Sequence, residues 1–243
     1  MDQLRSLADN RLVTGCIYCG GLEETRDHVP SKVFLDPPFP ENLPIVGACE
    51  ACNNGFSLDE EYLACLIESA IAGSANPDYI RRLKIADILR RSPQLQNRID
   101  SSKHIRNGQT YFEVESKRIK NIILKLARGH AAFELSQRCY ESPSSIWWYP
   151  IELLNDVQRE PFKSCHIVEA FGEIGSRWLQ RLIVLEIIIL SPIGEKLKRN
   201  VLVNDWINVQ DGCYRYLTVH DYEGVKIYMV IGEYLACRVM WTS

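Results

Sequence analysis

The sequence predicts an α+β fold with three parts: a cysteine-rich N-terminal module, a helical middle and a mostly antiparallel β-sheet in the C-terminal part. Three observations support this prediction. Two Cys-x-x-Cys pairs lie within residues 1–52, apolar residues recur at helical spacing up to residue 137, and short β-branched and aromatic runs follow from Ser145. We place the three parts at residues 1–75, 76–137 and 138–243.

The composition is typical of a globular protein, with 46% hydrophobic and 24% charged residues in a chain of 243. The first ten residues lack the apolar run of a signal peptide. The most apolar stretch, Leu182 to Leu190, is too short to span a bilayer and contains Glu186, so we expect a buried strand there. Five of the nine cysteines are scattered, as is usual in a reducing compartment. We therefore expect a cytoplasmic protein without a membrane segment.

Residues 12–56 are rich in Gly, Pro, Cys and Asn, which predicts irregular structure with short strands. The run from Asp36 to Pro40 is expected to form a loop, because proline cannot donate a hydrogen bond to a β ladder. The segment from Ser57 to Glu60 matches a capping box and predicts a helix that continues to about Ala72 and ends near Gly73.

In the middle part, Asn76-Pro77-Asp78 is a start signal for a second helix, which should end before Pro93. A third helix is predicted from about Ser116 to Gln137, with Gly129 as its weakest point. Its apolar stripe consists of Ile119, Ile122, Ile123, Leu126, His130 and Phe133.

The C-terminal part contains six apolar and aromatic runs that predict strands, at residues 146–149, 165–171, 181–190, 213–220, 225–231 and 234–241. The turn signal from Asp221 to Gly224 joins two of them. Nothing in this part names a ligand. We expect it to recognise substrate, to form a homodimer or to bind a regulatory partner.

The two cysteine pairs are Cys16/Cys19 and Cys49/Cys52. Two thiolates on one tight turn can point at one ion, and two such turns complete a closed structural zinc site. The 29 residues between the pairs leave room for a hairpin. Four buried thiols or two disulfides are the alternatives, and the repeated spacing favours zinc over both.

Further residues between and after the cysteines make the pattern more specific. They are Asp27-His28-x-Pro30, Asn42 and, directly after Cys52, Asn53. In this order, the residues resemble an HNH endonuclease of the zinc-stapled kind, over about residues 12–70. The resemblance implies a ββα-metal fold, in which a hairpin and a helix clasp one catalytic divalent ion. It also implies a place in phage defence or mobile elements, where small relatives of this family often serve.

The resemblance implies roles for four residues. His28 would be the general base that takes a proton from water as it attacks phosphorus. Asp27 and the side-chain oxygen of Asn53 would hold Mg²⁺ or Mn²⁺, which stabilises the transition state and the leaving oxygen. Asn42 would pin the hairpin loop and orient the base. Each residue also has an ordinary alternative role, as a turn residue or as a helix cap.

One position departs from the family pattern. Many relatives carry Lys or His three residues after the Cys-Asn asparagine, where this chain has Phe56. We expect Phe56 to pack in the interior and not to contact phosphate. Arg26 and Lys32 lie close to His28 in the sequence and are substitute phosphate contacts; either is alternatively a solvated surface charge.

The net charge of −3 hides an uneven distribution. Residues 1–80 carry 4 Lys/Arg against 13 Asp/Glu, whereas residues 81–128 carry 13 against 4. A strongly basic segment favours contact with nucleic acid over the alternative of a solvated helix face. The expected contacts are Arg81, Arg82, Lys84, Arg90 and Arg91.

Together these observations predict a metal-dependent HNH endonuclease that hydrolyses phosphodiester bonds, with DNA favoured as substrate. The alternative is a non-catalytic zinc module that binds nucleic acid or protein without cutting. The two differ in one structural respect. A nuclease requires Asp27, His28 and Asn53 to converge on a point separate from the four sulfurs.

Overall fold

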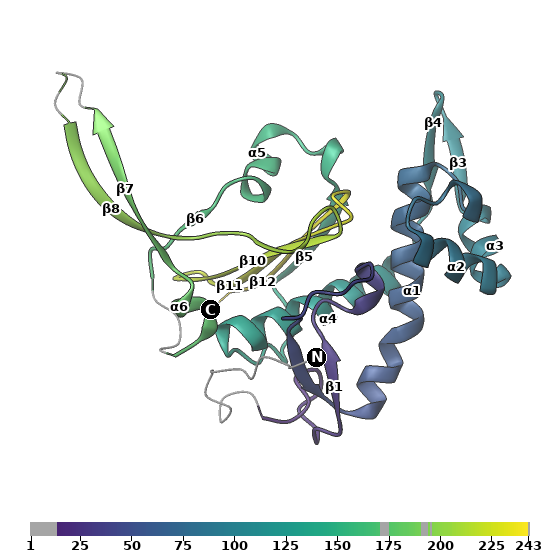
Figure 1. The fold of residues 1–243 in the computed structure, drawn as a ribbon, viewed down its shortest axis with the longest axis horizontal. Coiled ribbons are helices and arrows are strands. Elements are labelled where there is room, and N and C mark those ends of the chain that lie inside the picture. Colours follow the sequence, from purple (N-terminus) through teal and green to yellow (C-terminus); the bar gives the residue numbers. More distant parts are fainter. Residues whose placement is uncertain (1–13, 171–174, 191–193, 195, 243) are drawn as a thin grey trace.

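The structure is a computed structural model, and it describes residues 14–170, 175–190, 194 and 196–242. The predicted α+β class is confirmed (Figure 1). The N-terminal module is an antiparallel hairpin of β1 (Thr25–His28) and β2 (Ile45–Ala48), followed directly by helix α1 (Glu50–Ala72). A hairpin followed by a helix is the ββα order expected for residues 12–70.

Helix α1 begins at Glu50, so the start predicted at Ser57 is wrong. Its N-cap is Cys49, whose sulfur accepts a hydrogen bond from the backbone N–H of Cys52 at 3.4 Å. The cysteine turn therefore supplies the cap that a Ser or Asp usually provides, and a capping-box search does not find it. The predicted end is confirmed, because Gly73 closes the helix in the left-handed conformation with φ 66°.

The middle part contains three more helices and a small hairpin. Asn76 caps only a 3-10 turn at Pro77–Tyr79, so the second predicted helix begins later than its start signal. It ends before Pro93, as predicted. The helices are α2 (Leu83–Arg91), α3 (Pro93–Ser101) and α4 (Ser116–Leu135), and the hairpin strands are β3 (Lys103–Arg106) and β4 (Gln109–Phe112).

The C-terminal part is built on a five-stranded antiparallel sheet in the order β5-β12-β11-β10-β9. Four predicted runs form four of its five strands, and the turn expected from Asp221 to Gly224 joins β10 to β11. The strands are β5 (Ser145–Pro150), β9 (Ile207–Gln210), β10 (Tyr214–Asp221), β11 (Gly224–Ile231) and β12 (Leu235–Thr242). Strand β9 was not predicted, since its Asn and Gln residues interrupt the apolar pattern.

A second, three-stranded sheet has the order β6-β8-β7. Its strands are β6 (His166–Ile167), β7 (Ile183–Leu190) and β8 (Lys196–Asn204). A short helix α5 (Asp156–Arg159) precedes β6, and a second short helix α6 (Arg177–Gln180) lies between β6 and β7 in the sequence. The run predicted at residues 165–171 forms only the two-residue β6, and the basic start of β8 concealed that strand from sequence patterns.

Strand β7 contradicts one expectation. The apolar stretch Leu182 to Leu190 was predicted to be buried, whereas every residue of β7 is exposed. Strands β7 and β8 form an arm that projects away from the rest of the molecule (Figure 1). Among the described residues, no helix is long and apolar enough to cross a membrane.

Helix α4 lies at the centre of the molecule, where it contacts α1, β2 and strands β10, β11 and β12 of the five-stranded sheet. One core cluster includes Leu63 of α1, Leu89 of α2, Ile122 of α4 and Tyr214 of β10. The three predicted parts therefore share one core. His130 of α4 is buried in it, as expected for a core histidine: it stacks on Tyr216 with ring centroids 3.7 Å apart.

The predicted loop from Asp36 to Pro40 is irregular, and it connects the N-terminal module to the C-terminal sheet. The backbone N–H of Asp36 donates to Gln210 Oε1 at 2.7 Å, and Gln210 Nε2 donates to the Asp36 carbonyl oxygen at 2.8 Å. Arg82 of α2 also binds the Asp36 carboxylate, at 2.9 Å. The loop is thus held from both sides.

Gly129 allows α4 to approach the hairpin. A Cβ at this position would lie 2.6 Å from Cγ2 of Val29, a fully buried residue directly after β1. We expect Gly129→Ala to destabilise the protein, because overpacking costs about 1–3 kcal/mol and outweighs the roughly 1 kcal/mol gained in helix propensity. Urea unfolding measures this change. Gly55→Ala is the matched control, since nothing lies within 4 Å of its Cβ position. A Gly129 variant as stable as the Gly55 variant contradicts this packing.

Candidate functional site

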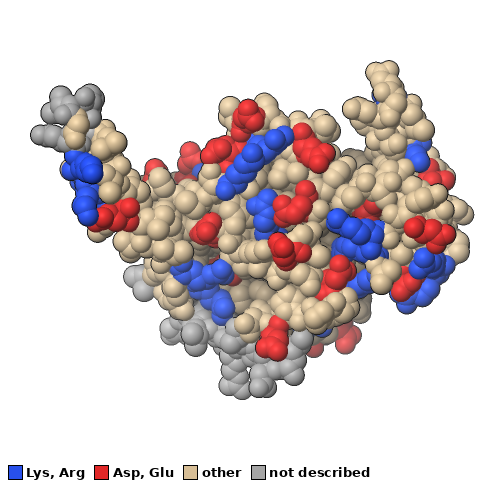
Figure 2. Space-filling model, turned by 45° about the horizontal axis from the view of Figure 1, so that its top comes forward, with Lys and Arg blue, Asp and Glu red and all other residues tan. Residues whose placement is uncertain are grey.

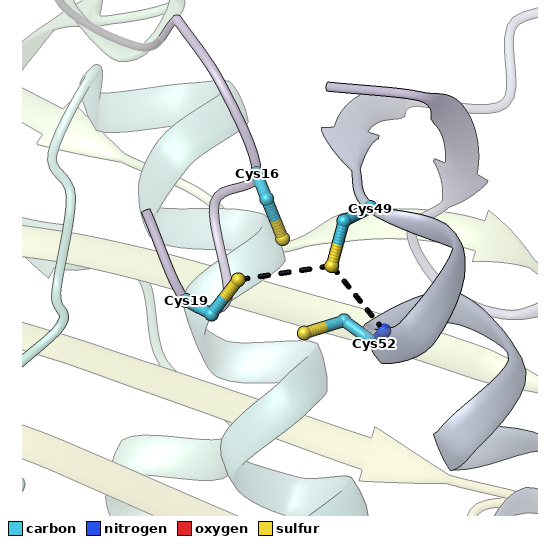
Figure 3. Close-up of side chains that lie close together, drawn as sticks. All are labelled: Cys16, Cys19, Cys49 and Cys52. Atoms are coloured by element: carbon cyan, nitrogen blue, oxygen red, sulfur yellow. Dashed lines mark hydrogen bonds between the residues drawn. The ribbon is translucent and has the colours of Figure 1, made fainter. Parts of the chain in front are cut away.

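The four paired cysteines converge at the base of the hairpin, with their side chains pointing toward one another (Figure 3). All four sulfurs lie within 4.8 Å of one another, and Cys19 Sγ is 3.7 Å from Cys49 Sγ. In a tetrahedral site with Zn–S bonds of about 2.3 Å, the sulfurs are about 3.8 Å apart. The cysteines are free thiols and not disulfides. The donor set and its spacing therefore fit a zinc ion held by Cys16, Cys19, Cys49 and Cys52.

Local backbone structure positions both pairs. The first pair lies on a tight turn, in which the Gly20 N–H donates to the Cys16 carbonyl oxygen at 2.8 Å and Gly20 adopts φ 79°. The second pair lies at the start of α1, with Cys49 as the cap and Cys52 in the first turn. A helix N-terminus stabilises thiolates, because its free N–H groups and dipole favour negative charge.

The pKa values of the sulfurs reflect their crowding. Burial acts to raise the pKa of Cys16, but backbone N–H groups of Cys49, Tyr18 and Cys19 donate to the sulfur and lower the pKa to about 7. Burial and the neighbouring sulfurs raise the pKa of Cys52. The Cys16 thiolate thus forms easily, whereas ionisation of Cys52 needs a compensating positive charge, which zinc supplies.

The structure places Asp27 in the interior. Asp27 Oδ2 accepts a hydrogen bond from the Tyr18 hydroxyl at 2.7 Å and forms an ion pair with Lys125 Nζ at 2.8 Å. Nζ also lies 2.5 Å from Glu60 Oε1 and donates to Ser31 Oγ at 2.6 Å. The Asp27 carboxylate is therefore bonded to an ammonium group, in the position where the HNH resemblance would place a divalent ion.

Lys125 was not among the predicted site residues, although the sequence contains a signal for it. It follows Ile122 by three residues and so lies on the apolar stripe of α4, where a lysine is out of place. The side chain is 2% exposed. A buried lysine has to be paired, and Asp27 and Glu60 are its partners. The sequence could not show which carboxylates these would be.

Asn53 lies on the same face of the hairpin as Asp27. Its Nδ2 donates to Thr25 Oγ1 at 3.1 Å, and Thr25 precedes Asp27 by two residues on β1. Residues two apart on a strand share one face. An amide oxygen and a carboxylate, as Asn53 and Asp27 offer, are the kinds of donor that suit Mg²⁺ or Mn²⁺. The set fits only in part, because Lys125 and Tyr18 already bind one oxygen of Asp27.

His28 occupies the adjacent position on β1, and its side chain therefore points to the other face of the hairpin. Within the described part of the chain, its imidazole has no hydrogen-bond partner. Burial lowers the pKa of His28, and the neighbouring Lys32 lowers it further, so the ring is neutral at pH 7. A neutral, half-buried imidazole is the form a general base requires.

The structure does not join Asn42 to the site. This residue lies in an exposed turn before β2, and no side-chain hydrogen bond of Asn42 is found in the described residues. Phe56 is half-buried and packs against the core, with its ring 5.0 Å from that of Tyr18. Arg26 is exposed on β1, and Lys32 is half-buried with its ammonium 5.5 Å from the centre of the Phe39 ring.

The basic middle part is neutralised in part by ion pairs within the chain. Arg82 pairs with Asp36, Arg90 with Asp78 and Arg118 with Asp59, at 2.9, 3.2 and 2.7 Å. Each pair joins a cation of residues 81–128 to an acid of residues 1–80. The uneven charge distribution is therefore explained in part by ion pairs between the two segments. On the face shown in Figure 2, blue and red side chains are interspersed and form no single basic patch.

This pairing changes the expectation for the five predicted nucleic-acid contacts. Arg82 is buried, and Lys84 donates to the Lys32 carbonyl oxygen at 2.6 Å. Arg90 is exposed but paired with Asp78 and Asp87, and Arg91 Nε donates to the Asp87 carbonyl oxygen at 3.2 Å. Arg82 is therefore a structural residue. Arg81 is exposed and is the best placed of the five to meet a ligand.

Comparison of the chain with known proteins adds no family. The scan against protein-family models gives no match, and the searches of curated proteins and of solved structures give none either.

Proposed function

We propose that the chain is a metal-dependent endonuclease of the HNH type, in which His28 acts as the general base. The observation that carries the proposal is the zinc-stapled hairpin and helix, with a neutral imidazole at the end of β1 and no competing hydrogen bond to it in the described residues. The Asp27-His28 pair ends β1, and Asn53 lies in the first turn of α1, which follows the order of motifs in the HNH resemblance.

In this proposal, each residue has a defined task. The cysteines would fix the start of α1 against the hairpin, and thereby hold Asn53 beside Thr25, two residues before Asp27 on β1. His28 accepts the proton of the attacking water. A divalent cation bound through Asp27 and Asn53 would stabilise the charge that develops on the phosphate and the leaving oxygen. Arg26 and Arg81 are exposed cations that would contact the nucleic-acid backbone.

The second candidate is a zinc module that binds nucleic acid or protein without cutting. The ion pair between Asp27 and Lys125 favours it, since the carboxylate is buried and already neutralised. The position of His28 on the other face of the hairpin from Asp27 also favours it. Under this candidate, residues 15–72 form a scaffold, and His28 contacts a ligand or solvent.

The test is a cleavage assay on supercoiled plasmid, single-stranded DNA and RNA. The protein is assayed with Mg²⁺, with Mn²⁺ and with neither, at a chelator level that leaves the zinc content unchanged. The endonuclease proposal predicts cleavage only with a divalent ion. The polymer that is cut fastest identifies the preferred substrate. Binding without cleavage of any of the three polymers supports the second candidate.

A further inference from the structure

A pocket of about 820 Å³ lies beside helix α2, and it has no role in the proposed chemistry at His28. The loop at Asp36 and Pro37 forms a second wall, and residues 211–213, between β9 and β10, form a third. Pockets that hold small organic molecules usually measure about 300–1,000 Å³. Four of the lining residues are cations: Arg81, Arg82, Lys84 and Arg91.

The wall also contains three acids, Asp36, Asp87 and Asp211, and two of them are neutralised by ion pairs. Asp36 pairs with Arg82 at 2.9 Å, and Asp87 pairs at 3.1 Å with Arg90, which does not line the pocket. Within the described part of the chain, Asp211 forms no ion pair and accepts an amide hydrogen bond at 3.4 Å. The wall is therefore left with one uncompensated negative charge.

Three of the four cations have no acid as their partner. Within the residues that the structure describes, Arg81 forms no hydrogen bond or ion pair. Arg91 donates through Nε to the Asp87 carbonyl oxygen at 3.2 Å, and its terminal nitrogens have no partner there. Lys84 Nζ donates to the Lys32 carbonyl oxygen at 2.6 Å. Three positive charges against the one acid that is left give the wall a net charge of +2.

The pKa of Lys84 reflects this excess of positive charge. Burial lowers the pKa, and the neighbouring Arg82 and Lys32 lower it further, while Asp36 offsets part of the effect. An anion in the pocket would relieve the repulsion among these cations. The charge of the wall therefore points to an anionic ligand.

We propose that this pocket binds a diphosphate-bearing small molecule, of the size of a nucleoside diphosphate. Arg81 and Arg91 lie at opposite ends of α2, a helix of 9 residues that is about 13 Å long. A ligand with two anionic groups therefore meets both cations better than a single phosphate does. Guanidinium groups bind phosphate oxygens in a bidentate manner. Pro37 and Leu83 are exposed in the wall and offer apolar contact to the organic part of the ligand.

The acids favour a small molecule over a nucleic-acid strand. A strand carries a charge at every nucleotide and is bound along a continuous basic groove. Asp87 and Asp211 interrupt such a groove within the pocket, and Asp78 pairs with Arg90 at 3.2 Å. A small ligand can place its phosphates at the cations and avoid the acids.

Isothermal titration calorimetry of the full chain tests the proposal, in a buffer without divalent ions. The ligands are adenosine diphosphate, inorganic pyrophosphate and inorganic phosphate. One diphosphate ligand is expected to bind per chain, and phosphate should bind roughly tenfold more weakly, because it meets fewer of the cations. Tighter binding of adenosine diphosphate than of pyrophosphate would show that the organic part contributes. Equal affinities would assign the recognition to the diphosphate alone.

Three variants locate the site. Arg91→Ala should weaken binding of adenosine diphosphate by about tenfold, because charge-assisted hydrogen bonds are lost. Arg106→Ala is the matched control, since Arg106 is an exposed cation outside the pocket. Asp211→Asn should strengthen binding by roughly twofold or more, because it removes a like charge from the wall. A misfolded variant could not produce this gain. Arg81 is left unchanged, because it also has a place in the proposed function.

Three results would overturn the proposal. The first is the absence of saturable binding of either diphosphate below about 1 mM. The second is equal affinity of the Arg91 and Arg106 variants. The third is binding of a single-stranded oligonucleotide that Arg91→Ala weakens, while neither diphosphate binds. No cleavage is measured, so the result is independent of whether the protein is an endonuclease.

Discussion

Replacing Cys49 with Ser is expected to release the zinc and unfold residues 15–72. Cys49 supplies one of the four sulfurs and also caps α1. Structural zinc contributes roughly 10–16 kcal/mol of apparent binding free energy in small zinc modules at neutral pH, which is as large as the whole stability of a typical domain. The loss should therefore extend to the core that α1 shares with α4.

Metal analysis and urea unfolding check this prediction together. The wild type should contain one zinc ion per chain, and the Cys49→Ser variant less than a tenth of that. Cys165→Ser is the matched control, because Cys165 is an exposed cysteine outside the cluster. A wild type without zinc, or a Cys49 variant that unfolds at the wild-type urea concentration, would contradict the zinc assignment.

The second large effect is expected at Lys125. Replacing it with Met removes the ammonium that Asp27 and Glu60 share, and leaves two carboxylates next to each other in the interior. Breaking one side of a buried ion pair costs about 3–5 kcal/mol. We expect a loss of this size in the free energy of unfolding at pH 7. Lys120→Met, at an exposed position on the same helix, should change it by less than about 0.5 kcal/mol.

A double-mutant cycle with Asp27→Asn isolates the pair. If the two groups interact as the structure places them, the double variant should lose clearly less stability than the sum of the single variants. Additive losses would show that Asp27 and Lys125 do not stabilise one another. They would also free Asp27 for a divalent ion and strengthen the endonuclease proposal over the non-catalytic one.

Local signals in the sequence predicted most of the fold. The errors of this prediction have physical causes. Four of the strands of the five-stranded sheet follow from apolar patterns, and the end of α1 follows from Gly73. The start of α1 was missed because a cysteine turn caps it. The burial expected for residues 182–190 was wrong because local hydrophobicity does not report where a strand lies in the fold, and every residue of β7 is exposed on the arm that it forms with β8.

Some residues of the candidate site could also be predicted from the sequence, and others could not. The four cysteines were predictable, because their spacing fixes two turns that can share one ion. The partner of Asp27 was not, since Lys125 is distant in the sequence and approaches only through the packing of α4 on the hairpin. The charge of the basic segment could be counted from the sequence, but the fold decides which of its cations meet acids of the same chain, as Arg82, Arg90 and Arg118 do.

The measurement that tests the central claim most directly compares plasmid cleavage by the wild type, His28→Ala and His104→Ala, at equal zinc content. His104 is an exposed histidine on β3, far from the hairpin in the sequence. Loss of a general base lowers rates by about 10²–10⁴-fold. The proposal predicts a loss of at least 100-fold for His28→Ala and no change for His104→Ala. Equal cleavage by all three proteins, or cleavage by none under any divalent ion, would contradict it.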